Sequence, residues 1–454
     1  MSELVGISQS NQMKLIQKAS FLLTVFLCVF IPLRSVLELY TVSYVKMVPD
    51  ILILGLLLWY AITIRFRFKF VLQDWIFLGF IALAFVSSIF INHVGISPFI
   101  FQVRSIGIYY IFYFVLRNLQ FGKKEFVSIV MVLQIMAIFL FAFAVVEKIA
   151  SKTLLFPSSI ADGIIYASNF SRVYSLFFNP NTYAMFLDFV IFLSIFRRIS
   201  YGVKTHSVVY GILVASVLLS MSRAGIIILV AGTILISIYM MVKYRKAIPY
   251  KKLILSSLIV LVIGSAGYLG VQAGANVYHE MVLKDSKQDS DKISSSMQIG
   301  AGDRFDNTLT EEELEQSGND GRIYSLTKGL EIVSDYPIFG TGFGTFGSAA
   351  SMNFEPAIAE KYDLPFPFYA DNEYIKVLVE NGILGAIVFV GFLVAVLYYY
   401  RKDLVKLFMC LVFGWFGLFY NVFEVQIGAM LFWMTLSLVK FPTFQESSKI
   451  DKRM

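Results

Sequence analysis

Residues 126–146 read FVSIVMVLQIMAIFLFAFAVV and carry no charged side chain. A helix needs roughly 20 such residues to cross a bilayer, because each residue adds about 1.5 Å and the hydrocarbon core is roughly 30 Å thick. Backbone polar groups find no water in that core, so the segment must satisfy them within one helix. This stretch therefore predicts a transmembrane helix and decides the class of the protein.

Apolar stretches of similar length recur outward from this one along most of the chain. Of the 454 residues, 57% are hydrophobic and 15% are charged, which leaves a soluble domain of this size too little polar surface. The sequence predicts an all-α polytopic membrane protein with about twelve spans. The expected spans are Ala19–Leu37, Val45–Ile64, Val71–Ile91, Ile96–Leu116, Phe126–Val146, Asn181–Phe196, Ser207–Met221, Ala224–Val242, Leu253–Val271, Ile383–Tyr400, Leu407–Tyr420 and Val425–Val439.

Short basic clusters follow every second expected span. They contain Arg65, Arg67, Lys69, Arg117, Lys123, Lys124, Arg197, Arg198, Lys204, Lys243, Arg245, Lys246, Lys251, Lys252, Arg401, Lys402 and Lys406. All of them fall on one side of the membrane, and the positive-inside bias places that side in the cytoplasm together with tails at 1–18 and 442–454. The net charge of +7 is thus explained by topology, and nucleic acid is not expected as a partner.

Two segments are then expected on the outer face. One is 149–180. The other is 272–382, which lies between the ninth and tenth spans and separates two membrane regions, 19–271 and 383–441. Within the larger loop, 284–317 is rich in Ser, Asp, Glu and Lys, which predicts a mobile and solvated insert. Residues 322–382 carry Gly, Pro and many aromatic residues, a composition that predicts a packed structure on the membrane face.

Two arginines are candidate anion ligands. Arg223 lies in Ser222-Arg223-Ala224-Gly225, where two expected spans meet almost without a loop. Its position fits either an arginine that reaches the membrane interface or one that grips phosphate oxygens at two points. Arg322 opens a helix expected over 323–334, and the turn after that helix exposes backbone at Gly340 and Gly342, beside which an anion could also bind.

A polar run, Asp371-Asn372-Glu373-Tyr374, begins a helix expected to continue to Gly382, with Asp371 as its N-cap. Partial burial beside a membrane raises the pKa of a carboxyl group and suits it to act as a general base. We expect Asp371 or Glu373 to be that base, and Asn372 and Tyr374 to contact substrate. A capped amphipathic helix would explain the same residues without any chemistry.

Further polar candidates lie in the first outer loop and inside a span. Arg172, Asn179 and Asn181 precede the sixth span, where Asn-Pro-Asn is also a good helix start. Arg104 falls near the middle of the fourth span, where an unpaired charge costs several kcal/mol. It should therefore face a polar cavity or a partner, for which Asp188 in the sixth span is a candidate.

Neither a metal nor a cofactor is expected. Cys28 and Cys410 lie in apolar spans, the histidines are scattered, and no Gly-Lys nucleotide loop is present. Aromatic faces suit sugar rings and arginines suit diphosphates. Together they indicate a lipid-diphosphate-linked glycan as substrate, whose own activated bond supplies the energy for the reaction.

Four segments, in this order, resemble the O-antigen ligase and Wzy-type polysaccharide polymerase superfamily of bacteria. They are 172–181, 222–225, 322–342 and 371–385, and the likeness covers most of the chain. It implies a GT-C-like membrane fold and a glycosyltransferase that moves an undecaprenyl-diphosphate-linked glycan to an acceptor hydroxyl outside the cytoplasmic membrane, with inversion and without a metal. Arg223 and Arg322 match family arginines that would bind the diphosphate and stabilise it as leaving group.

One position departs from the ligases of this superfamily, which typically carry His where Asp371 stands. An acid at this position is more similar to the polymerases of capsule, exopolysaccharide or teichuronic acid, so a polymerase is the leading interpretation. A ligase that uses another acceptor stays open. A lipid-linked glycan flippase also stays open, because Arg104 inside a span would suit transport. A chain-length regulator is a candidate partner protein.

Overall fold

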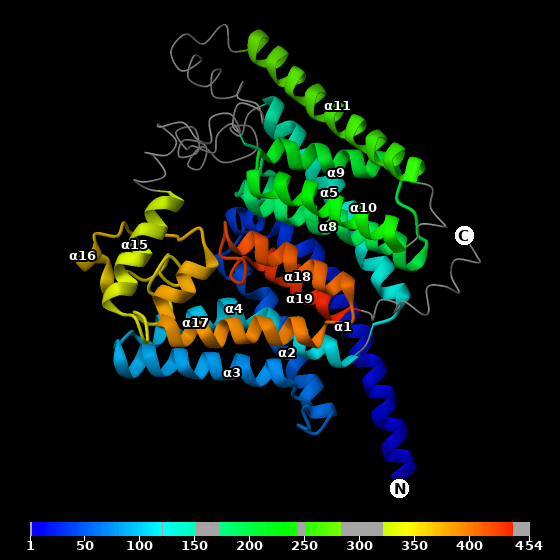
Figure 1. Cartoon of the computed structure of the whole chain (residues 1–454). Coiled ribbons are helices and arrows are strands. Elements are labelled where there is room, and N and C mark those ends of the chain that lie inside the picture. Colours follow the sequence, from blue (N-terminus) through cyan, green and yellow to red (C-terminus); the bar gives the residue numbers. More distant parts are fainter. Residues whose placement is uncertain (1, 120, 151–171, 244–249, 283–320, 439–454) are drawn as a thin grey trace. The chain divides into compact units, whose positions relative to one another are not determined.

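The computed structural model describes residues 2–119, 121–150, 172–243, 250–282 and 321–438, which form helices and turns without a β-strand (Figure 1). The expected insert at 284–317 and most of the expected outer loop at 149–180 lie outside these residues. The chain divides into two compact units. Unit 1 comprises Met1–Thr24, Met47–Gly122 and Leu309–Phe441, and unit 2 comprises Val25–Lys46, Lys123–Thr308 and Pro442–Met454.

Unit 1 is built around α17, which packs along α3 and receives α15 near its start (Figure 1). The helix α4 packs between α2 and α19. The elements of this unit are α2 (Val48–Thr63), α3 (Leu72–Phe85), its π-helical continuation η2 (Val86–Ile91), α4 (Ile96–Leu119), α15 (Arg322–Asp335), α16 (Ile358–Tyr362), α17 (Glu373–Tyr399), α18 (Leu404–Gly417) and α19 (Gln426–Ser437).

Unit 2 is built around α9, which contacts α5, α8 and α11. The contact with α11 is close because two glycines face it: a Cβ on Gly211 would lie 2.2 Å from Ile263, and one on Gly264 would lie 2.7 Å from Val214. Small residues serve this purpose in membrane helix pairs. The elements are α5 (Lys123–Ala150), η3 (Ser175–Phe177), α8 (Pro180–Tyr201), α9 (Ser207–Ser220), α10 (Arg223–Lys243) and α11 (Tyr250–Val282), while α1 (Ser2–Tyr40) and η1 (Ser43–Met47) are divided between the units.

Each expected span coincides with a helix, and eight of the helices are long and apolar enough to cross a membrane. The protein is therefore a multi-pass membrane protein. Two helices extend beyond the expected ends of their spans. Most of the expected tail at 1–18 is the first part of α1, and α11 runs to Val282, beyond the expected end of the ninth span at Val271. Hydropathy detects the apolar centre of a helix, whereas backbone hydrogen bonding continues into its polar ends.

Arginines from the predicted basic clusters also make buried contacts inside the units. Arg117 donates through Nη1 and Nη2 to the two carboxylate oxygens of Asp74, at 3.0 and 2.7 Å. Arg197 donates to the side chains of Gln134 and Thr205, at 3.1 and 2.8 Å. These arginines thus fix helix packing as well as contributing to the charge bias that predicts orientation.

A break in α17 at Gly382 connects the packed loop to the membrane helix. Gly382 has φ 63° and ψ −170°, a backbone conformation that only glycine adopts easily. The break leaves helix carbonyls without partners, and they accept from the glycine turn: Thr341 N–H donates to Val379 O and Gly342 N–H to Glu380 O, both at 2.9 Å. In return, Ile383 N–H donates to Pro337 O at 2.8 Å.

The same glycine turn is held from the other side by η2 of unit 1. Ser87 Oγ donates to Phe339 O at 2.7 Å, and the Phe343 N–H donates to Ser88 Oγ at 2.7 Å. Asn92 Nδ2 donates to Gly340 O at 3.0 Å. Polar side chains at the end of a predicted span therefore satisfy the backbone of the loop and fix its position on this helix.

Replacing Gly382 with Ala is expected to destabilise the protein by about 1–3 kcal/mol, because the backbone conformation is strained for any other residue. A Cβ there would also lie 2.3 Å from Ile338 O. Thermal unfolding of the purified chain in detergent measures the effect. Gly391→Ala, in the same helix with no atom within 4 Å of its Cβ, is the matched control and should not lower stability. Equal melting temperatures for the two variants would contradict this account.

Candidate functional site

The structure brings two of the predicted catalytic residues together in unit 1. Arg322 is the first residue of α15, and Asp371 lies two residues before α17. Arg322 Nε lies 4.0 Å from Asp371 Oδ2, and each side chain is 38% exposed. Both groups are thus anchored at helix starts yet open to a ligand, which is the arrangement that an anion-binding and proton-accepting site requires.

Asn372, and not Asp371 as expected, caps α17. Its side-chain oxygen accepts from the N–H groups of Tyr374 and Ile375, both at 3.0 Å. Its amide group donates to Leu418 O at 3.1 Å, joining the helix start to the segment after α18. Both residue types are good caps, and the one placed next to the first helical residue takes the role. The Asp371 carboxylate lies outside this cap and faces Arg322.

Replacing Asn372 with Ala should lower stability by about 0.5–2 kcal/mol, because two helix N–H groups lose their acceptor. Asp371→Ala should change stability much less, since a half-exposed ion pair contributes little. Urea or thermal unfolding of the two variants in the same detergent makes the comparison. A larger loss of stability in Asp371→Ala than in Asn372→Ala would mean that the cap is wrongly assigned.

Aromatic rings lie near the Arg322–Asp371 pair. The Arg322 guanidinium carbon lies 5.3 Å from the centre of the Phe419 ring. The rings of Tyr369 and Tyr420 lie 5.5 Å apart, and both tyrosines are partly exposed. Desolvation, together with the neighbouring Tyr420 and nearby carboxylates, raises the pKa of Tyr369 well above its usual value, so its phenol keeps its proton.

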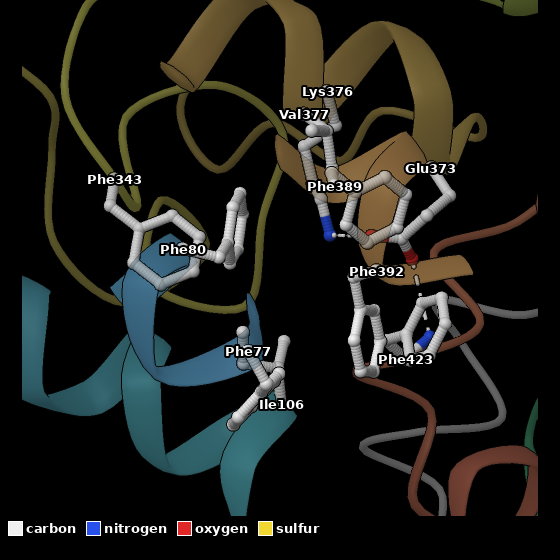
Figure 2. A pocket seen from close by; sticks show the side chains of 10 residues that line it. All are labelled: Phe77, Phe80, Ile106, Phe343, Glu373, Lys376, Val377, Phe389, Phe392 and Phe423. Carbon is white, nitrogen blue, oxygen red and sulfur yellow. Dashed lines mark hydrogen bonds and ion pairs between the residues drawn. The ribbon is translucent and has the colours of Figure 1, made fainter. Parts of the chain in front are cut away.

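Glu373, the other candidate base, is buried two residues after Asp371 and lies beside Lys376 (Figure 2). Its Oε1 lies 2.7 Å from Lys376 Nζ, and its Oε2 accepts from the Phe423 N–H at 3.2 Å. Both side chains are at most 3% exposed. Lys376 also pairs with Glu424, which lies beyond α18 in the sequence. The result is a buried carboxylate–ammonium–carboxylate chain between the start of α17 and the segment before α19.

This buried chain extends into the packed loop. Glu424 accepts from the side-chain amide of Gln102 and, through Oε2, from the Ala349 N–H at 2.6 Å. Glu380 Oε1 accepts from the Phe346 N–H at 3.0 Å. Sequence analysis missed Lys376, Glu424 and Gln102. An isolated charge in an apolar stretch, as at Glu424, was the available signal, because such a charge requires a partner.

A small cavity adjoins Glu373 and Lys376 (Figure 2). It has a volume of about 20 Å³ and is otherwise lined by apolar side chains, among them Phe80, Phe343 and Phe423. This volume holds roughly one water molecule and excludes a sugar ring. We therefore assign Glu373 and Lys376 to the buried ion-pair network of unit 1.

The remaining predicted residues of this unit make structural contacts. Gly340, at φ 69°, lies against the break in α17, where a Cβ would come within 2.5 Å of the Asn381 nitrogen. At Gly342, with φ 100°, a Cβ would lie 2.6 Å from Val94. The Tyr374 hydroxyl donates to Gly414 O in α18 at 2.8 Å. Each of these residues joins two elements that flank Arg322 and Asp371.

A second group of predicted residues meets in unit 2, where α8 and α10 begin. Asn179 caps α8, accepting from the N–H groups of Asn181 and Thr182 at 2.9 and 3.1 Å. Asn181 Oδ1 accepts from Arg172 Nη2 at 2.8 Å and from Ser222 Oγ at 3.0 Å. The three predicted polar residues before the sixth span therefore form one connected cluster.

Arg223 begins α10 beside this cluster. Only Met221 and Ser222 separate it from the end of α9, as the sequence indicated. The Ser222 hydroxyl accepts from the Gly225 N–H at 3.3 Å, as a capping residue does. A Cβ on Gly225 would lie 2.7 Å from that of Ala184, so glycine lets α10 approach α8 at this point. The Ser-Arg-Ala-Gly run thus holds the start of Arg223's helix in place.

Arg104 has a different partner from the expected Asp188. Its Nε donates to Asp50 in α2, which is buried. Asp188 lies in unit 2, is fully buried, and has no hydrogen-bond partner among the described residues. Asp50 takes this place because α2 packs directly on α4. The Arg104 side chain therefore joins α4 to α2.

No group of three or more His, Cys, Asp or Glu side chains in the described ranges is arranged to hold a metal ion. Residues 208–390 match the family model described as O-antigen ligase. The matched range contains Arg223, Arg322, Asp371 and Glu373. Residues 208–390 are an O-antigen ligase family domain.

This family domain indicates a glycosyltransferase-type enzyme of polysaccharide biosynthesis, and it implies a lipid-linked glycan as substrate. The resemblance found from the short motifs is thereby confirmed. No curated protein matches the sequence.

Proposed function

We propose that this O-antigen ligase family protein is a polysaccharide polymerase, which transfers a glycan from undecaprenyl diphosphate to a hydroxyl of an acceptor glycan. The observation that carries the proposal is the Arg322–Asp371 pair, 4.0 Å apart and half-exposed within the family domain. Glycan transfer from a diphosphate needs a cation for the leaving group and a base for the acceptor. This pair supplies both.

In the proposed reaction, the acceptor oxygen attacks the anomeric carbon from the side opposite the diphosphate. The acceptor O–H proton passes to Asp371, and the bond between the anomeric carbon and the diphosphate oxygen breaks, so that its electron pair leaves with the diphosphate. Arg322 binds that leaving group, on which negative charge develops in the transition state. Arg223 is proposed as a further diphosphate ligand from its place in the family domain alone. The configuration at the anomeric carbon is inverted, and no metal takes part.

Asp371 is the proposed base in preference to Glu373. The Glu373 carboxylate is at most 3% exposed, and its oxygens are engaged by Lys376 and the Phe423 N–H. A base must come within about 3 Å of the acceptor hydroxyl, which the half-exposed Asp371 can do. An acid in place of the histidine typical of ligases also favours the polymerase.

The other predicted binding residues have supporting roles in this proposal. Arg172 and Asn181 hold the start of α10 and so position Arg223. Gly340, Gly342 and Tyr374 fix the packed loop and α18 around Asp371. These residues act on the substrate through Arg223 and Asp371.

The proposed topology has about twelve spans in a GT-C-like arrangement, both termini in the cytoplasm and the loop at 272–382 on the outer face. The coincidence of each expected span with a helix supports this count, although α9, α18 and α19 are shorter than a usual span. A chain-length regulator is a further proposed partner.

The glycan length profile of a deletion strain tests the function. A polymerase predicts lipid-linked intermediates that carry a single repeat. A ligase is the second candidate, favoured by the description of the matched family, and it predicts long lipid-linked chains that are not transferred. Glycan trapped on the cytoplasmic side of the membrane would instead indicate a flippase and contradict the proposal.

A further inference from the structure

The turn between α18 and α19 presents two aromatic side chains that the core does not require. Phe419 and Tyr420 are both partly exposed. The Phe419 ring lies beside Arg322, and the Tyr420 ring faces Tyr369, which precedes Asp371 by two residues. The ring of Trp415 lies 5.2 Å from that of Phe419 and supports it from α18. Aromatic surface is thus placed around the proposed base and the proposed anion ligand.

This turn is fixed by polar contacts to the start of α17. Leu418 O accepts from Asn372 Nδ2 at 3.1 Å, and the Phe423 N–H donates to Glu373 Oε2 at 3.2 Å. Asn421 Nδ2 donates to Gly347 O at 2.7 Å, which ties the turn to the packed loop as well. Binding surfaces held in this way lose little conformational entropy when a ligand arrives.

The chemistry of this surface suits a sugar ring better than a lipid chain. An acyl chain offers no polar group to a surface that contains the half-exposed Arg322 and Asp371 side chains, and it would remove water from both charges, which is costly. A pyranose fits both kinds of surface, since its C–H face packs on aromatic rings while its hydroxyl groups bond to the Tyr369 phenol and the Asp371 carboxylate. Its hydroxyl groups would also lie next to Asp371.

We propose that Tyr369, Phe419 and Tyr420 form a stacking subsite for the terminal sugar of the acceptor glycan. The subsite holds that ring with the attacking hydroxyl beside Asp371. This assignment rests on the proposed function for the identity of the acceptor, whereas the recognition of a sugar ring follows from the surface itself. Tyr420 contributes a ring face, and its partner Tyr369 contributes a phenol that remains protonated.

The test uses the full-length purified protein, the lipid-diphosphate-linked repeat unit of the producing strain as donor, and the lipid-free repeat unit released from it by mild acid as acceptor. Tyr420→Leu and Phe419→Leu should each raise the KM for the acceptor about 3- to 10-fold, because leucine keeps the apolar volume but removes the ring face. The turnover number and the donor KM should stay within about 2-fold. Tyr420→Phe should behave as wild type, and so should Tyr398→Leu, an exposed tyrosine on α17.

Direct binding separates failure of the subsite from failure of the proposed function. Calorimetric titration of the lipid-free repeat unit should give a dissociation constant that rises in Tyr420→Leu in the same proportion, whether or not the protein polymerises. Turnover absent from wild type, together with ring-dependent binding, would overturn the polymerase and keep the sugar subsite. An unchanged acceptor KM and dissociation constant in both leucine variants would overturn the subsite, and a rise in the donor KM alone would overturn its assignment to the acceptor.

Discussion

Replacing Arg322 with Ala is expected to reduce glycan transfer by about 10²- to 10³-fold while the protein still inserts and folds. A fixed donor aimed at developing negative charge typically contributes this much to a transfer rate. The loss of stability should be small, because the side chain is 38% exposed and its carboxylate partner lies 4.0 Å away. Initial rates of purified protein with the lipid-linked donor measure the effect, and polymer length in cells should fall in parallel.

Arg401→Ala is the matched control for this prediction. Arg401 is an exposed arginine that also lies over an aromatic ring, at 3.9 Å from the centre of Tyr398, but it follows α17 at the end opposite Asp371. Its replacement should leave transfer unchanged. The same rate measurement applies to Arg223→Ala. If both Arg322→Ala and Arg223→Ala still make normal long polymer, these arginines do not bind the diphosphate.

Replacing Lys376 with Met is expected to destabilise the protein by about 3–5 kcal/mol, the usual cost of removing one partner from a buried ion pair. Lys376 is 1% exposed and lies between Glu373 and Glu424, so its removal leaves two buried carboxylates without their cation. The thermal midpoint in detergent should fall by roughly 10 °C, given about 2–4 °C per kcal/mol for domains of roughly 150–250 residues.

Lys328→Met is the matched control. Lys328 pairs with Glu331 at the same sequence spacing as Lys376 with Glu373, at 3.1 Å, but the pair is partly exposed. Its loss should change the midpoint by very little. In addition, Glu424→Gln combined with Lys376→Met should recover part of the lost stability, because one of the unpaired charges is then removed. Equal midpoints for Lys328→Met and Lys376→Met would contradict the buried network.

Local chain chemistry was sufficient to predict the helices. Apolar runs such as 126–146 specify a span by themselves, because the membrane leaves a helix as the only way to satisfy the backbone. The boundary at Gly382 was also predictable, since glycine ends a helix by its own conformational freedom. The cap was missed by one residue, because Asp371 and Asn372 are similarly good caps and only the backbone at the helix start distinguishes them.

Pairing across the chain was not predictable in the same way. Arg104 binds Asp50 and not Asp188, and Lys376 binds Glu424 from beyond α18. In each case the sequence shows a buried charge that needs a partner, but the choice among distant candidates depends on which helices pack together.

The sequence by itself determined that the chain spans the membrane and that its helices begin and end near the observed residues, and it made Arg223, Arg322 and Asp371 candidates for glycan transfer. Those properties depend on neighbouring residues and on backbone hydrogen bonding. Only the tertiary structure decided that Arg322 faces Asp371, that Glu373 is buried in an ion pair, and that Phe419 and Tyr420 lie beside them. These are contacts between residues far apart in the chain, and they form only when packing brings α15, α17 and the turn after α18 to one place.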